Sequence, residues 1–185
     1  MFLADIGNTH IHFFKNDVVW HKKATQSIIN SIDEIIYFIS VNSSLSASLK
    51  KKTNWIDIKE KIYLNGEYKT LGIDRKLACI GIKNGIIIDA GSAITVDIMQ
   101  NNKYKGGYIF PGLKVLEKSF GIISDNLNYS FNYSLSLDIL PKNTQDSISF
   151  SIFYSLVSGI ENLPYNLPII ITGGDAKTLV PFFKT

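Results

Sequence analysis

Two short segments place an aspartate and a glycine directly after an apolar run. In FLADIGNT, Gly7 follows Asp5 by two residues, and in IIIDAGSA, Gly91 follows Asp89 by two residues. Glycine lets the backbone approach a ligand closely, and successive N–H groups at such a turn can bind an anion. A carboxylate beside the turn can hold the cation that neutralises a phosphate. The two segments therefore predict phosphate binding, with two hairpins of ordinary turn residues as the alternative.

A second candidate site is the segment LGIDRK, which contains Asp74 and Arg75. Arg75 is the only arginine among 19 basic side chains. In a chain that otherwise uses lysine, an arginine suggests a need for its planar fork, which binds a carboxylate through two hydrogen bonds. Asp74 is suited to act as a general base on a hydroxyl group. The alternative is a helix-capping aspartate beside an incidental arginine, and these residues alone do not decide between the two.

Other site signals are weaker. The segment ITGGD near the C-terminus follows an apolar run, and its glycines could bring the backbone close to a phosphate or a flat ligand. His10 and His12 alternate along one predicted strand, but no third metal ligand is evident, so we interpret them as ordinary strand histidines. Cys79 is the only cysteine, and we expect it to pack in the core.

The elements that must position these residues form two similar meanders of strands, which predicts two similar lobes. Apolar runs and turn residues predict strands over residues 2–5, 11–15, 18–22, 37–41, 86–89, 94–100, 104–109 and 168–172. Helical spacing predicts helices over residues 27–36, 43–52, 74–83, 113–120, 144–163 and 175–183, whereas residues 53–70 are expected to be rich in turns.

The predicted helix over residues 144–163 is apolar on several faces, which indicates burial on several sides and predicts a homodimer. We expect Phe153 on its outer face. The apolar residues of this helix are Ile148, Phe150, Ile152, Phe153, Leu156, Val157 and Ile160.

Composition limits the possible partners. The net charge is only +3 and the lysines are scattered, which argues against a nucleic-acid partner. The sequence has no apolar run of membrane-spanning length, so no membrane partner is expected. We expect a cytoplasmic protein.

Taken in order, the motifs of this chain resemble those of the type III pantothenate kinases. The family shares D-x-G-N-[ST], L-G-x-D-R, D-x-G-[TS]-A-x-T-x-D, G-G-x-I-x-P-G, K-N-T and T-G-G-[DN]-A. Here they stand at Asp5–Thr9, Leu71–Arg75, Asp89–Asp97, Gly106–Gly112, Lys142–Thr144 and Thr172–Ala176. Each motif is weak alone, but the ordered set is highly specific.

The resemblance implies an α/β fold with mixed sheets, built as two ribonuclease-H-like lobes of the actin-like ATPase fold. We expect these lobes at residues 1–83 and 84–185. The resemblance also implies ATP-dependent phosphorylation of pantothenate to 4'-phosphopantothenate, the first step of coenzyme A biosynthesis, with Mg²⁺ and a monovalent cation, K⁺ or NH₄⁺. A homodimer with a shared active site is implied as well. The alternatives are a catalytically silent accessory or regulatory protein, or a kinase of another small hydroxy acid.

Carried over to the matching positions, the resemblance implies that Asp74 is the catalytic base. Asp89 would bind the monovalent cation, and Asp5 would bind magnesium. Pantothenate would be bound by Tyr68, Gly72, Ile73, Asp74, Arg75 and Thr144, with Thr144 reaching across the dimer interface and Tyr68 preferred over Tyr63. ATP would be bound by Asp5, Ile6, Gly7, Asn8, Thr9, His10, Ile11, His12, Ser92, Gly173 and Gly174. Many family members carry lysine or arginine at the position of His12.

Overall fold

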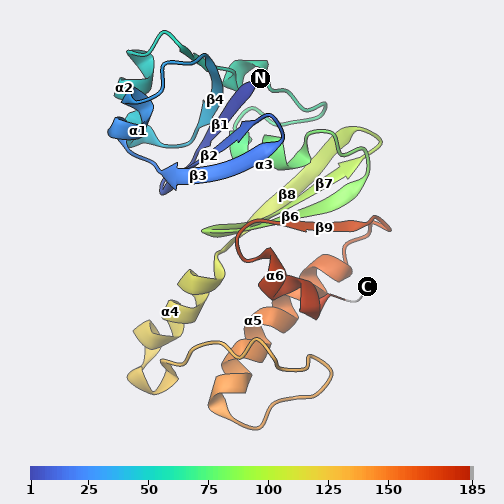
Figure 1. The fold of residues 1–185 in the computed structure, drawn as a ribbon. Helices are drawn as coiled ribbons and strands as arrows, with labels where there is room; N and C mark the ends of the chain where they lie inside the picture. Colours follow the sequence, from blue (N-terminus) through green and yellow to red (C-terminus); the bar gives the residue numbers. More distant parts are fainter. Residues whose placement is uncertain (184–185) are drawn as a thin grey trace. The chain divides into compact units, whose positions relative to one another are not determined.

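The computed structural model describes residues 1–183, and the chain divides into two compact units, which are described separately below (Figure 1). The first unit contains Met1–Leu64 and Tyr68–Leu77, and the second contains Asn65–Glu67 and the chain from Ala78 onward. We keep the lobe boundary after residue 83 as a proposal. No helix within residues 1–183 is both long and apolar enough to cross a membrane.

The first unit is built on a five-stranded sheet with the order β3-β2-β1-β4-β5. Strands β1, β2 and β3 form an antiparallel meander, while β4 runs parallel to β1 and β5 parallel to β4. Asn16 and Asp17 join β2 to β3 with positive φ angles of 49° and 62°, as a two-residue type I′ hairpin requires. The strands are β1 (Phe2–Ile6), β2 (His10–Lys15), β3 (Val18–Lys23), β4 (Ile36–Ser40) and β5 (Trp55–Asp57).

Short helices complete the first unit. They are α1 (Gln26–Asn30), α2 (Ser46–Lys50), the start of α3 (Ile73–Cys79), and the 3-10 helices η1 (Ser43–Leu45) and η2 (Lys59–Lys61). Alternate residues of β1 and β2, including Ile6 and Phe13, pack with Ile29 of α1 and Leu49 of α2 in one buried cluster. Because successive side chains of a strand point to opposite faces, Asp5 and His12 lie on the other face of this sheet.

The second unit repeats this plan. Its sheet has the order β8-β7-β6-β9, with β6, β7 and β8 as an antiparallel meander and β9 parallel to β6. Asn101 and Asn102, with φ angles of 55° and 57°, make a hairpin turn of the same type as the turn in the first unit. The strands are β6 (Gly85–Ala90), β7 (Ala93–Gln100), β8 (Lys103–Pro111) and β9 (Ile169–Thr172). The mixed α/β fold class and the internal repeat are therefore confirmed.

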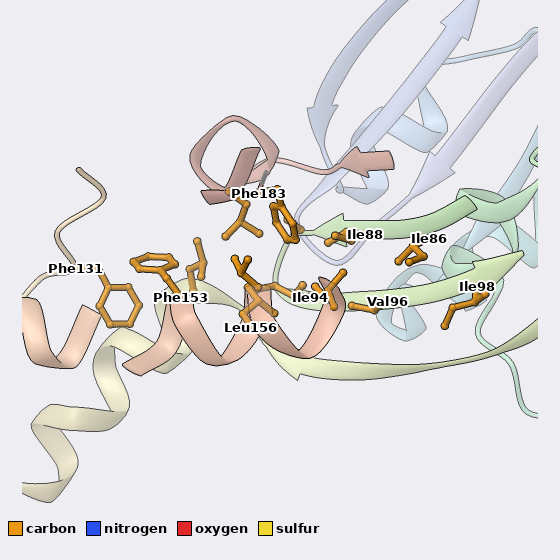
Figure 2. Packing of buried hydrophobic residues seen from close by; sticks show 14 of the residues in the cluster. Ile86, Ile88, Ile94, Val96, Ile98, Phe131, Phe153, Leu156 and Phe183 are labelled. Carbon is orange, nitrogen blue, oxygen red and sulfur yellow. The ribbon is translucent and has the colours of Figure 1, made fainter. Parts of the chain in front are cut away.

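The core of the second unit lies between one face of this sheet and the long helix α5 (Figure 2). Ile88, Ile94 and Val96 of the sheet pack with Leu156 and Phe153 of α5. The helices are α4 (Leu113–Ile123), α5 (Thr144–Glu161) and α6 (Ala176–Leu179), with the 3-10 helices η3 (Asp125–Leu127) and η4 (Val180–Phe182).

The expected outer position of Phe153 is wrong. Its side chain is 0% exposed, and its ring stacks on Phe182 with centroids 4.3 Å apart. Of the seven apolar residues predicted to spread around α5, all except Phe150 belong to or pack against this unit's own core. Phe150 instead stacks on Tyr154 with centroids 5.0 Å apart, and Tyr154 is 49% exposed. The apolar pattern of α5 is therefore explained by the fold of one chain.

Three other expectations differ from the structure. The helix expected over residues 27–36 ends at Asn30, and Ile36 begins the strand β4. Residues 53–70 contain the strand β5, which pairs with β4 over three residues only, a length too short to give a periodic signal. The helix expected over residues 175–183 is divided into α6 and η4, and Pro181 in η4 lacks the N–H group that would continue an α-helix.

Candidate active site

Asp5 stands near the end of β1, on the face of the sheet opposite the core. It lies directly across from His12 of β2, and the turn after β1 is closed by a hydrogen bond of 2.9 Å from Gly7 N to His10 O. The side chain of Asn42, which is 5% exposed, donates from Nδ2 to Gly7 O at 3.0 Å and to Asn8 O at 3.3 Å. The turn predicted to bind phosphate is thus held in one conformation.

The charged groups near Asp5 include Asp74 of the LGIDRK segment. Its carboxyl group still touches solvent, yet the surrounding protein removes much of its hydration, and this burial raises the pKa of Asp5. His12 lowers this pKa, and the like charge of Asp74 raises it further. His12 and Asp74 therefore both lie close to Asp5 within a single unit.

The LGIDRK segment forms the beginning of α3. Asp74 lies exposed in the first turn of this helix, and its Oδ1 accepts a hydrogen bond of 2.9 Å from the backbone N of Arg75. A Cβ atom at Gly72 would lie 2.5 Å from the same Oδ1, so the glycine leaves the space that this carboxylate occupies. Arg75 is only 5% exposed, and its Nη1 donates to Tyr68 Oη at 3.0 Å. The structure thus connects Tyr68 to the motif, whereas Tyr63 is 70% exposed.

The three histidines of the chain gather on β2 and β3. The ring of His21, directly across from His12, lies 5.8 Å from the ring of His12 and 5.2 Å from that of His10. Sequence reasoning missed His21 because the strand register brings it there. Within residues 1–183, no group of three histidine, cysteine or acidic side chains could hold a metal ion.

In the second unit, Asp89 occupies the same place in β6 that Asp5 occupies in β1. Thr95 of β7 and Thr172 of β9 lie directly across from Asp89, so three oxygen-bearing side chains form one row across the sheet. Thr95 is 8% exposed, and within the described residues its Oγ1 has no hydrogen-bond partner. Asp97, the last aspartate of this motif, is fully buried and accepts a hydrogen bond of 2.7 Å from Tyr104 Oη, which is a structural role.

Two glycines let other segments pack against the end of β6. Gly173, at a φ of +93°, approaches so closely that a Cβ atom there would lie 2.4 Å from Ala90 O and 2.6 Å from Asp89 Oδ1. A Cβ atom at Gly112 would lie 2.5 Å from the carbonyl oxygen of Ser92. The GGD turn and the end of the GGYIFPG motif therefore enclose the Asp89 turn, while Ser92 and Gly174 remain exposed.

The close approach of Gly173 makes its replacement costly. We expect Gly173→Ala to lower the free energy of unfolding by about 1–3 kcal/mol, because the methyl group would meet backbone atoms and the left-handed φ would be strained. Gly174→Ala is the matched control, since a Cβ atom there meets nothing within 4 Å. Its effect should stay within about 0.5 kcal/mol. Urea denaturation followed by circular dichroism measures both, and equal stability of the two variants would contradict the packing described here.

The predicted site residues thus fall into two groups, one in each unit. Residues 5–12, Tyr68 and residues 72–75 belong to the first unit, and their acidic groups are close enough to interact. Asp89, Ser92 and residues 173–174 come together at one edge of the second sheet. Thr144 also belongs to the second unit and is the exposed first residue of α5.

Comparison with known proteins identifies the family. A family model described as type III pantothenate kinase matches residues 25–165. A type III pantothenate kinase of Sulfurimonas denitrificans is 42% identical over 99% of this chain and 88% of its own, and one of Helicobacter hepaticus is 40% identical over 100% and 90%.

A crystal structure from Campylobacter jejuni, described as a conserved putative Baf family transcriptional activator, has the same fold. Its TM-score is 0.87 at 34% identity, covering 100% of this chain and 88% of that one. The alignments with the two relatives span nearly the whole chain, and the family model covers the site residues from Tyr68 to Thr144. The chain belongs to the type III pantothenate kinase family.

Proposed function

We propose that this protein transfers the γ-phosphoryl group of ATP to the hydroxyl group of pantothenate, giving 4'-phosphopantothenate and ADP in the first step of coenzyme A biosynthesis. The observation that carries the proposal is the intact LGIDRK motif, with an exposed carboxylate on Asp74 beside the buried Arg75, whose Nη1 donates to Tyr68 Oη. Family membership supplies the reaction. We place the reaction in the cytoplasm.

Asp74 is the general base of this proposal. The pantothenate oxygen attacks the γ-phosphorus, its proton passes to the Asp74 carboxylate, and ADP leaves with the electrons of the broken P–O bond. The Asp74 carboxylate lies close enough to Asp5 to raise the pKa of Asp5. Gly72 keeps the space in which the Asp74 oxygen lies.

Substrate contacts are assigned to the same segment. Tyr68 and Arg75 bind pantothenate as a connected pair, with the hydrogen bond from Arg75 Nη1 fixing the tyrosine hydroxyl. Gly72 and Ile73 line the site through their backbone. Thr144 of a second copy of the chain completes it, as the family resemblance implies.

The ATP contacts use the two aspartate–glycine turns. In the first unit, residues Asp5 to His12 bind the phosphates, and the hydrogen bonds from Asn42 support the turn that follows β1. In the second unit, Ser92, Gly173 and Gly174 contact the nucleotide. The exposure of Ser92 and Gly174 supports this assignment.

The residues at the two turns fit the cations that the family uses. Mg²⁺ keeps several waters and needs only one or two carboxylates besides the phosphates, so Asp5 is a sufficient protein ligand for it. The row formed by Asp89, Thr95 and Thr172 supplies oxygen atoms, and the unpartnered Thr95 hydroxyl suits a site for a hard monovalent cation beside Asp89. When bound, these cations neutralise the charge of the phosphates.

The proposed role of Asp89 gives a direct test. Turnover should require potassium or ammonium, and Asp89→Ala should be inactive at any potassium concentration, because no other acidic side chain occupies this turn. Steady-state rates in potassium, ammonium and sodium buffers measure this. Turnover that does not depend on the monovalent ion would show that Asp89 does not bind a monovalent cation needed for the reaction. Asp138→Ala, at an exposed position in the same unit, is the control.

A homodimer belongs to the proposal because the family shares its substrate site between two copies. The 49% exposed ring of Tyr154 stacks on the half-buried ring of Phe150, and we assign this pair on α5 as the apolar surface of the contact. We expect a dimer in sedimentation velocity at micromolar concentration and a monomer for Tyr154→Glu, which places a charge on that surface. Tyr63→Glu, at a 70% exposed tyrosine, should leave the dimer unchanged. A monomeric parent protein would overturn this part of the proposal.

A second candidate function is a catalytically silent regulatory protein. The description of the Campylobacter jejuni structure as a putative transcriptional activator favours it. A coupled ADP-release assay of the pure protein, with potassium and magnesium present, separates the two functions. Pantothenate-dependent ADP release supports the kinase, and its absence supports the silent protein. Other hydroxy acids in place of pantothenate test for a different substrate.

A further inference from the structure

The first turn of α5, which begins at Thr144, is held by a set of side-chain hydrogen bonds. Asn143 caps the helix, since its Oδ1 accepts from Asp146 N at 2.8 Å and its Nδ2 donates to Asp146 Oδ2 at 2.7 Å. The first bond satisfies one of the backbone N–H groups that a helix start leaves open, and the second links the two side chains. One carboxylate oxygen of Asp146 is thus used within the motif.

The other oxygen is bound by a residue outside every motif recognised in the sequence. Asn132 Nδ2 donates to Asp146 Oδ1 at 2.7 Å, and the backbone N of Asn132 donates to Ser149 Oγ at 2.8 Å. Ser149 is fully buried and donates in turn to Gln145 O at 2.9 Å. The side-chain hydrogen bonds from Asn132 and Asn143 lower the pKa of Asp146, with the bond from Asn132 as the main cause. Asn132 therefore connects to α5 at two points, Asp146 in the first turn and Ser149 in the second.

Asn132 is itself fixed by the two residues that precede it. The backbone N of Phe131 donates to Glu117 Oε2 of α4 at 2.8 Å, and the buried ring of Phe131 lies 5.4 Å from that of Phe153. Gln145 Nε2 donates to Ser130 O at 2.9 Å. Residues 130–132 thus join α4, the core and the start of α5, and they set where that start lies.

We propose that Asn132 is a positioning residue, which through Asp146 holds the first turn of α5 so that Thr144 can contact pantothenate. The inference rests on the proposed function of Thr144. Thr144 is exposed and stands at the end of the helix, where turns fray unless they are capped. Asn143 directly precedes the helix, so its cap holds the turn only to the adjacent residue. Asn132 lies farther away along the chain and holds the turn to the rest of the unit.

The test is Asn132→Asp, which keeps the shape of the side chain but turns the donor into a carboxylate facing Asp146. We expect the KM for pantothenate to rise roughly tenfold or more, the scale of a lost hydrogen bond to a charged group. The kcat and the KM for ATP should change by less than about threefold, because the chemistry and the nucleotide contacts remain. A residue that only supported the fold would not separate the two KM values.

A double variant provides the rescue. In Asn132→Asp combined with Asp146→Asn, donor and acceptor exchange places, and the oxygen of the new amide can still accept from Asn143 Nδ2. The KM for pantothenate should return to within about threefold of the parent value, as expected for two residues that act through one bond. Asn126→Asp is the control, because it makes the same charge change at an exposed position between α4 and α5.

The outcomes separate the inference from the proposed function. An active parent protein whose KM for pantothenate is unchanged in Asn132→Asp, or is not restored in the double variant, overturns the inference alone. A parent protein that releases no ADP with pantothenate overturns both. If Asn132→Asp loses its folded circular dichroism spectrum, Asn132→Ala, which removes the donor without adding a charge, is measured with the same expected direction.

Discussion

Replacing Asp74 by asparagine should lower turnover by roughly 100-fold or more while ATP affinity stays nearly unchanged. Asparagine keeps the shape of the side chain and can still accept the hydrogen bond from the Arg75 backbone, but its amide does not take up the proton of the attacking hydroxyl. Steady-state ADP release gives the turnover, and calorimetry gives the ATP affinity of the same preparation.

The matched control for this prediction is Glu60→Gln, which removes one negative charge from an exposed position of the same unit. Its turnover should equal that of the parent protein, which separates proton uptake from a change in total charge. Full turnover in Asp74→Asn would show that another group accepts the proton, and the general base would have to be sought elsewhere.

Replacing Arg75 by lysine should weaken pantothenate binding by about 1–3 kcal/mol and leave ATP binding almost unchanged. Lysine keeps the positive charge but loses the planar fork, which holds Tyr68 Oη and, in the proposal, the carboxylate of pantothenate. Because Arg75 is 5% exposed, the shorter cation also lacks water to take over these contacts. Isothermal titration with pantothenate measures the change.

Lys69→Arg, at an exposed position of the same segment, is the control and should bind pantothenate as the parent does. Thermal unfolding of Arg75→Lys should be recorded as well, because the arginine is buried. Equal pantothenate affinity in a folded Arg75→Lys would restrict this arginine to a role in the fold.

The strand framework and the places of Asp5 and Asp89 could be predicted from the sequence. Both aspartates follow strongly apolar strands, and period-two alternation places them on the face opposite the core. The internal repeat then predicted a second sheet like the first. Local pattern was enough for these features because each depends on residues that are neighbours in the chain.

The features that could not be predicted depend on residues that are far apart in the chain. Asn42 contacts Gly7 O from 35 residues away, and Asn132 contacts Asp146 from 14 residues away, so neither contact is encoded in a local period. Phe153 was placed on the outside because a helix apolar on several faces suggested a partner chain. The core of the second unit instead extends around α5, with Phe131 and Phe182 covering Phe153.

The hydrogen bonds from Asn42 to the turn after β1 have a consequence for the thermodynamics of binding. A flexible loop loses conformational entropy when it closes on a ligand, and that loss is subtracted from the affinity. Here Asn42 holds the carbonyl groups of Gly7 and Asn8 before any ligand arrives. The conformational entropy of this turn is therefore lost when the chain folds. The binding of an anion at its amides does not lower that entropy again.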